Sequence, residues 1–178
     1  MARYSAAKIQ EMLEESDNAA TADEKGDKLE ILIRYIFDKV PGVTFYQKNI
    51  LDRNRTHELD LAFWNLQSQS AICFLDPVII VECKNTAQPL GGTGVGWFVR
   101  KLQDRGISYG ILVSLSGITG QADGHSNAHS EVLSALTRDG IKILLIDRQE
   151  LLSLANTDDL VELLKTKILR LTLYKAIN

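Results

Sequence analysis

The chain has 178 residues, of which 45% are hydrophobic and 24% are charged, as in a single soluble globular domain and unlike a disordered chain. Twenty Lys and Arg against 23 Asp and Glu give a formal net charge of −3, which argues against a protein that coats nucleic acid indiscriminately. The sequence contains no apolar run long enough to span a membrane and no signal-like pattern at its start. We therefore expect a cytoplasmic protein without a membrane partner.

Apolar spacing predicts helices before the first strand. Residues 6–15 are amphipathic and a polar stretch follows, so residues 1–25 are interpreted as an N-terminal helical extension. From Leu29 the apolar residues recur at helical spacing until Pro41 and Gly42 end the pattern. Glu30 lies at the margin of this apolar stripe, where its carboxylate can reach a cleft beside the core.

Strand-like patterns occupy the middle of the chain. Residues 43–51 and 57–64 are predicted strands, and in the second Glu58 and Asp60 share one face while Leu59, Leu61 and Phe63 share the other. Residues 71–75 are a predicted short strand, and residues 78–84 form an apolar central strand that ends in two charges. The two cysteines at positions 73 and 83 lie in these runs, and we expect buried thiols rather than a disulfide framework.

The second half of the chain alternates between helices and strands. The predicted order is a glycine-rich loop (91–96), a helix (97–104), a strand (109–115), a helix (127–139), a strand (141–146), and helices at 149–154 and 158–174. This order predicts a single-domain α/β fold with a central mixed β-sheet flanked by helices. Residues 26–155 are its expected core, and residues 156–178 a C-terminal helix that packs on or extends that core.

The charged end of the predicted central strand carries the chemistry. Glu82 and Lys84 are two residues apart and point the same way, whereas Cys83 points into the opposite layer. If the strands 57–64 and 78–84 are antiparallel neighbours, Asp60 shares an edge of the sheet with Glu82. Two carboxylates, a peptide carbonyl and water are suitable ligands for Mg²⁺. A nearby lysine can orient an attacking water, so the pattern suits phosphodiester hydrolysis.

These residues resemble the signature of the PD-(D/E)xK, or restriction-endonuclease-like, nucleases. That signature is an acidic residue on one strand, Glu/Asp-x-Lys on the next, and often a Glu on a preceding helix, matched here by Asp60, Glu82-Cys83-Lys84 and Glu30. The sequence is similar to the Mrr-like branch, the type IV restriction-endonuclease relatives, over about residues 26–155. The stretches 81–84, 110–114, 116–119 and 143–147 carry that similarity. The family's proline-aspartate pair is absent, because Asp76-Pro77 has the reverse order and a different position.

The resemblance implies a Mg²⁺-dependent DNA endonuclease, with Mn²⁺ as a substitute, and a role in defence against foreign DNA. By the same resemblance, Asp60, Glu82 and the backbone carbonyl of Cys83 would bind the metal. Lys84 would position or activate the water, and Glu30 would support a metal-bound water or a second metal. Such enzymes commonly dimerise, so we expect a homodimer or a higher homo-oligomer, restrained by a regulatory partner or subunit. The alternative is a catalytically inactive nucleic-acid-binding or assembly module with the nuclease fold.

Several basic residues are candidates for contacting the DNA backbone. Lys48, Arg53 and Arg55 precede the Asp60 strand, and Lys101 follows the glycine-rich segment. Trp64 and Trp97 can stack on bases, although core packing is the favoured interpretation for both.

Other motifs have weaker functional interpretations. Residues 91–96 read Gly-Gly-Thr-Gly-Val-Gly, but no Gly-Lys-Ser/Thr follows as in a phosphate-binding loop, so a flexible loop beside the site is favoured over nucleotide binding. His125 and His129 have a spacing that can bind zinc on a helix, yet no third ligand accompanies them. Glu58 shares a face with Asp60 and is an alternative metal ligand.

Overall fold

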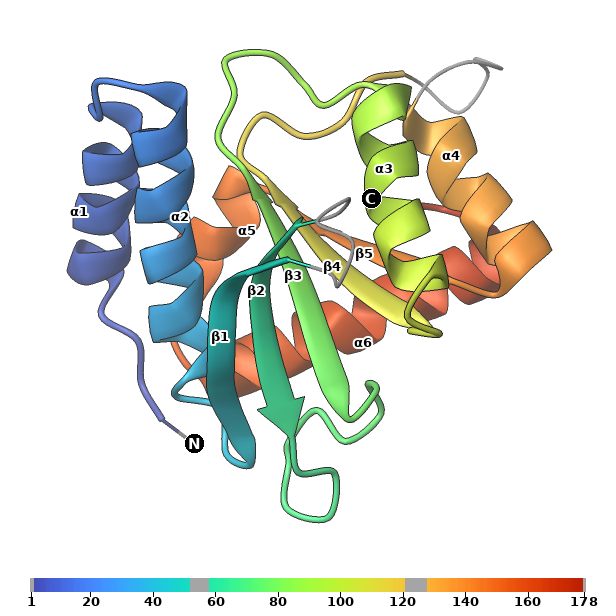
Figure 1. The fold of residues 1–178 in the computed structure, drawn as a ribbon. Coiled ribbons are helices and arrows are strands. Elements are labelled where there is room, and N and C mark those ends of the chain that lie inside the picture. Colours follow the sequence, from blue (N-terminus) through green and yellow to red (C-terminus); the bar gives the residue numbers. More distant parts are fainter. Residues whose placement is uncertain (1, 52–57, 121–127, 178) are drawn as a thin grey trace.

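A five-stranded sheet runs through the middle of the molecule in the computed structural model, which describes residues 2–51, 58–120 and 128–177 (Figure 1). The strands, in spatial as well as sequence order, are β1 (Val43–Leu51), β2 (Glu58–Asn65), β3 (Val78–Lys84), β4 (Tyr109–Ser114) and β5 (Lys142–Ile146). β1, β2 and β3 pair antiparallel, whereas β3, β4 and β5 pair parallel. The sheet is therefore mixed, as the sequence predicts.

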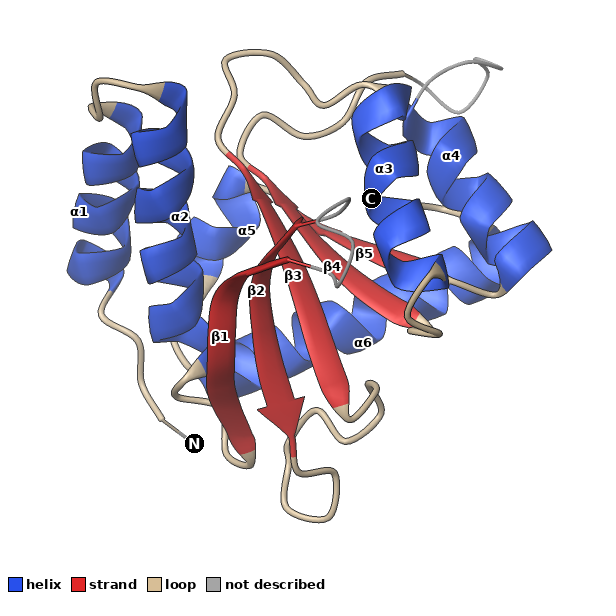
Figure 2. Ribbon diagram, viewed as in Figure 1, coloured by secondary structure: helices blue, strands red, loops and turns tan. Residues whose placement is uncertain are grey.

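Helices cover both faces of this sheet (Figure 2). The first face carries α1 (Ala6–Asp17), α2 (Ala22–Phe37), α5 (Arg148–Ser153) and most of α6 (Thr157–Tyr174), and the second carries α3 (Gly92–Gln103) and α4 (Ala128–Ser134). A buried apolar cluster lies under each set of helices. The first core includes Leu32 and Val81, and the second core includes Ile80 and Phe98. The predicted α/β fold with helices flanking a mixed sheet is confirmed.

Strand β3 forms the centre of the sheet because its side chains are apolar on both faces. Ile79, Val81 and Cys83 lie in the first core, and Ile80 lies in the second. A strand buried on both sides is read as a continuous apolar run, which is the pattern of residues 78–81. The run ends in Glu82, which is itself buried, and in Lys84, which is partly exposed.

The helix α2 begins earlier than its apolar stripe suggests. Thr21 caps the helix, accepting from the backbone N–H of Glu24, whose carboxylate accepts from the backbone N–H of Thr21 in return. This capping box satisfies two helix-end donors and moves the start to Ala22. The helix α1 packs nearby, with Ile9 and Leu13 fully buried in the first core. The predicted division of the chain at residues 26 and 156 stays a prediction.

The predicted glycine-rich loop is wrong, because α3 begins at Gly92 and includes most of residues 91–96. Burial of Val95 and Phe98 in the second core holds this segment helical. Gly110 on β4 allows the helix to approach closely, since a Cβ there would lie 2.9 Å from the Phe98 ring. The segment therefore supplies a packed helix beside β3 and β4 rather than a phosphate-binding loop.

Four further sequence expectations are wrong. Residues 71–75 form turns rather than a strand, and Cys73 is consequently exposed, whereas Cys83 is buried as predicted. Trp64 and Trp97 are more than half exposed and so are not core residues. Leu59 packs in the second core, whereas Leu61 and Phe63 pack in the first. At Leu59, β2 pairs with β1 but not with β3. A two-stranded ribbon twists more strongly than a wider sheet, which explains this change of face.

The helix α4 continues as a π-helix, Ala135–Asp139, which ends at Gly140 in the left-handed conformation. Together these two segments occupy the described part of the helix predicted at 127–139. Across the described residues, every helix is too short or too polar to cross a membrane.

Candidate active site

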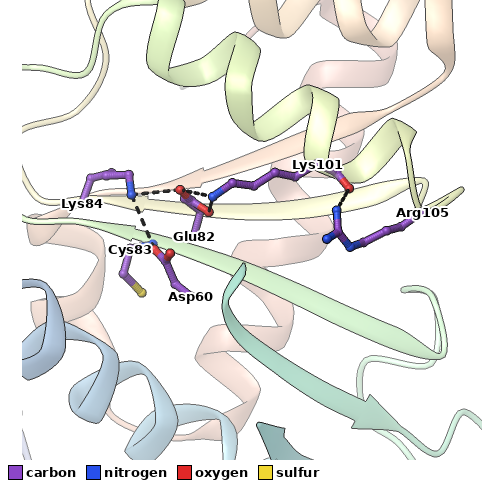
Figure 3. Close-up of polar contacts among 6 residues, drawn as sticks. All are labelled: Asp60, Glu82, Cys83, Lys84, Lys101 and Arg105. Carbon is purple, nitrogen blue, oxygen red and sulfur yellow. Dashed lines mark hydrogen bonds and ion pairs between the residues drawn. The ribbon is translucent and has the colours of Figure 1, made fainter. Parts of the chain in front are cut away.

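The pairing of β2 with β3 brings Asp60 to the charged end of the central strand. The two strands are antiparallel, with Leu61 opposite Val81, so the geometric condition stated for Asp60 is met. The Asp60 Oδ2 atom accepts a 2.7 Å hydrogen bond from the backbone N–H of Cys83 (Figure 3). This bond fixes the carboxylate of one strand to the backbone of the other, between Glu82 and Lys84.

Lys84 joins the two carboxylates. Its Nζ lies 2.9 Å from Glu82 Oε1 and 3.6 Å from Asp60 Oδ2, and the side chain is about one-third exposed (Figure 3). Burial alone would lower the pKa of Lys84, but the charges of Glu82 and Asp60 outweigh burial and raise it. Lys84 therefore stays protonated at neutral pH and acts as a hydrogen-bond donor rather than as a base.

The carboxylates are crowded in a poorly solvated place. The Glu82 side chain is only 6% exposed and that of Asp60 only 16%. The pKa of Asp60 is raised, first by burial and then by the charge of Glu82, although Lys84 and the Cys83 N–H oppose the increase. Excess negative charge of this kind is relieved by a proton or by a bound cation.

Glu30 of α2 lines the same cleft as Asp60, Cys83 and Lys84, a hollow of about 500 Å³ that we call the site cleft. The residue is 8% exposed, and its Oε2 atom is buried without a hydrogen-bond partner. Lys48 Nζ is 3.6 Å from that oxygen. The pKa of Glu30 is raised to about 7, mainly by burial and then by the charge of Asp60. Glu58 also lines the cleft but is exposed.

Two of the basic residues predicted to contact DNA are held by acidic partners. Lys48 makes a 2.7 Å ion pair with Asp27, near Glu30 at the rim of the site cleft. Lys101 reaches from α3 to Glu82, with Nζ 2.8 Å from Oε1 and 2.7 Å from Oε2 (Figure 3). No local signal indicates this pairing, because nothing in the helical pattern of α3 shows which strand it faces. The candidates Arg53, Arg55 and His125 lie outside the described residues.

A polar network that sequence reasoning missed anchors the chain just after Lys84. The Asn85 side-chain amide donates to Ser16 Oγ at 2.7 Å and to Asp17 Oδ1 at 3.3 Å. Ser16 donates in turn to the Lys25 carbonyl, and Arg148 donates to Asp17 Oδ1 at 2.7 Å. These contacts tie the end of β3 to α1, α2 and α5. Their partners are far apart in sequence, so no local motif could have indicated them.

The donor set fits a hard divalent cation. In the described part of the chain, no group of three or more His, Cys, Asp or Glu side chains is arranged to hold a metal ion. Mg²⁺ does not require such a cage, since it keeps several waters and binds through one or two carboxylates. Asp60 and Glu82 supply two carboxylates, and Glu30, whose Oε2 atom has no hydrogen-bond partner, is exposed to the charge of Asp60. The buried Cys83 thiol, whose pKa burial raises, points into the first core.

Comparison with known families agrees with this arrangement. A family model described as a restriction endonuclease, Mrr_cat, matches residues 22–155. The chain belongs to this family. The matched range of this Mrr_cat restriction endonuclease domain runs from the start of α2 through α5 and includes Glu30, Asp60, Glu82 and Lys84. The predicted resemblance to the Mrr-like branch of the PD-(D/E)xK nucleases is confirmed. No curated protein and no solved structure matched the chain.

Proposed function

We propose that this Mrr_cat domain is a Mg²⁺-dependent endonuclease that hydrolyses DNA phosphodiester bonds, with Mn²⁺ as a substitute metal. The main support for the proposal is that Asp60, Glu82 and Lys84 contact one another at the end of β3. Glu30 lines the site cleft together with Asp60 and Lys84. Membership of a restriction endonuclease family supports hydrolysis of nucleic acid and favours DNA. A role in defence against foreign DNA is part of the same proposal.

Asp60, Glu82 and the Cys83 carbonyl would hold the cation, and Glu30 would hold a water beside it. A bound divalent cation supplies Lewis-acid polarisation of a phosphoryl oxygen and makes water a better nucleophile at neutral pH. The Asp60 carboxylate is held in a fixed orientation for metal binding, because its Oδ2 atom accepts a hydrogen bond from the Cys83 backbone N–H. Glu30 is suited to exchanging a proton with water near pH 7, because its pKa is about 7.

Lys84 positions the attacking water and balances charge on the phosphoryl group. Its ammonium already donates to Glu82 Oε1 at 2.9 Å and lies 3.6 Å from Asp60 Oδ2, so it is placed to donate a further hydrogen bond to a water held between these residues. Its partial exposure leaves the ammonium accessible from the site cleft. A cationic hydrogen-bond donor suits the role of positioning the water better than the role of activating it.

Substrate would enter along the two clefts at the end of β3. A second hollow of about 540 Å³ adjoins the site cleft through Asn85 and Thr86 and is lined by Lys25 and Arg148. These two cations supplement Lys48 as candidate contacts to the DNA backbone. A homodimer, with two sites for two strands, and a regulatory partner that restrains cleavage complete the proposal.

Plasmid cleavage tests the proposal directly. We expect supercoiled plasmid to be nicked or linearised in Mg²⁺ or Mn²⁺ and to stay intact in EDTA. The Glu82→Gln variant should cleave at less than a hundredth of the wild-type rate. Plasmid that stays intact in both metals, but is retained in a gel-shift assay in EDTA, would instead identify a catalytically inactive nucleic-acid-binding module.

A further inference from the structure

Two ammonium groups contact Glu82, and one of them also lies near Asp60. Lys84 donates to Oε1, and Lys101 lies within hydrogen-bond distance of both Oε1 and Oε2. Lys84 is shared with Asp60, whereas Lys101 contacts only Glu82 of the two, so both oxygens of Glu82 already face an ammonium group. A further cation that binds Glu82 must share these oxygens with ammonium groups that repel it.

Of the two lysines, Lys101 is the more buried and is held in place by more contacts with Glu82. Its side chain is 12% exposed, against 32% for Lys84, and it contacts both Glu82 oxygens where Lys84 contacts one. Figure 3 shows its stem extending from α3 to Glu82, while the backbone carbonyl of Lys101 accepts a 2.8 Å hydrogen bond from Arg105. The flanking residues Val99 and Leu102 are buried in the second core. The ammonium is thus presented by a packed helix rather than by a free surface chain.

We infer that Lys101 is a positioning residue that competes with the divalent cation for Glu82 and thereby sets the metal affinity of the site. This inference rests on the proposed function, because it assigns a competitor to the proposed metal site. The ammonium holds the carboxylate in place in the metal-free protein, which limits repulsion between Glu82 and Asp60. The same ammonium opposes a cation by occupying its ligand atoms and by repelling its charge. The site is therefore stable without metal but binds metal weakly.

Removal of the Lys101 contact with Glu82 should therefore improve metal binding. Lys101→Gln removes the charge and keeps an N–H that can donate to Glu82. We expect Lys101→Gln to bind Mn²⁺ at least tenfold more tightly than the wild type, by isothermal titration calorimetry without DNA. Lys101→Arg keeps the charge and should stay within about threefold of the wild type. Lys165→Met removes one charge from an exposed pair with Glu162 on α6 and serves as the control.

Thermal unfolding provides a second measurement on the same proteins. In EDTA, Lys101→Gln should unfold at a lower temperature than the wild type, because Glu82 has lost a countercharge. Added Mn²⁺ should then raise its unfolding temperature more than that of the wild type, since ligand that binds only the folded state stabilises it. Lys101→Met, which has no donor, repeats both measurements if the glutamine variant does not fold.

The outcomes separate this inference from the proposed function. Unchanged or weaker Mn²⁺ binding in Lys101→Gln, with normal binding in the wild type, would overturn the competition and leave the metal site intact. Equal tightening in Lys101→Arg would show that charge is not the cause, and would also overturn it. Absence of binding in every variant, including the wild type, would overturn the inference together with the proposed metal site.

Discussion

Removal of the Glu30 carboxylate should change how the stability of the protein depends on pH. The folded protein holds the Glu30 proton up to a pKa of about 7, whereas the ordinary pKa is 4.5. Folding therefore takes up a proton between these values, and stability falls as pH rises from about 4.5 to 7. At 1.36 kcal/mol per pH unit, the full interval corresponds to about 3 kcal/mol of lost stability above pH 7. At pH 5 the free energy of unfolding has fallen by less than about 1 kcal/mol from its value at low pH.

Glu30→Gln keeps the shape of the side chain and removes this proton uptake. The assay measures the free energy of unfolding in urea with EDTA at about pH 5 and about pH 8. Between these pH values, the difference in this free energy between the variant and the wild type should shift by about 2 to 3 kcal/mol in favour of the variant. Any fixed cost of the buried amide cancels, because the comparison uses the difference between the two pH curves. Glu58→Gln, which removes an exposed carboxylate from the same cleft, is the matched control. Parallel curves for the wild type and Glu30→Gln would refute the electrostatic account of the cleft.

Three further substitutions test the site and its supports. Asp60→Ala should abolish both Mn²⁺ binding in calorimetry and plasmid cleavage; undiminished Mn²⁺ binding would remove Asp60 from the metal site. Asn65→Ala should lower the free energy of unfolding in urea by about 1 to 3 kcal/mol, because the buried Asn65 amide donates to the carbonyls of Ile72, Leu75 and Asp76. A decrease below about 0.5 kcal/mol would contradict that role. Gly110→Ala should lower the free energy of unfolding by about 1 to 3 kcal/mol, because the added methyl group clashes with Phe98. An unchanged midpoint of thermal unfolding would show that α3 can shift without loss of stability.

The sequence predicts the elements that carry the chemistry because their signals are local. The apolar run of β3 and the alternation of β2 place Asp60, Glu82 and Lys84 on neighbouring strands. The same locality explains the errors. Residues 91–96 are rich in glycine, yet the contacts of Val95 and Phe98 with the second core make them helical. Residues 71–75 are apolar, yet Asn65 binds the carbonyls around them and holds them in turns.

Contacts between distant segments could not be predicted in this way. The ion pair of Lys101 with Glu82 joins α3 to β3, and the predicted contact of Lys101 with DNA stays a prediction. Asn85 binds Ser16, 69 residues earlier in the chain, and neither residue belongs to a recognisable motif. Glu30 was expected beside a cleft from helical geometry alone, but its burial and its pKa depend on Asp60 and Lys48 from other elements. The sequence identifies the candidate site residues, and the fold determines their charges and partners.

The central claim is that Lys84 acts in the hydrolysis itself and not in holding the metal. The most direct test compares the wild type with Lys84→Ala in supercoiled-plasmid cleavage in Mg²⁺, with Mn²⁺ binding measured on the same preparations. We predict that Lys84→Ala loses at least 99% of the cleavage rate while it binds Mn²⁺ as tightly as the wild type or more tightly. Cleavage by Lys84→Ala at close to the wild-type rate would contradict the mechanism.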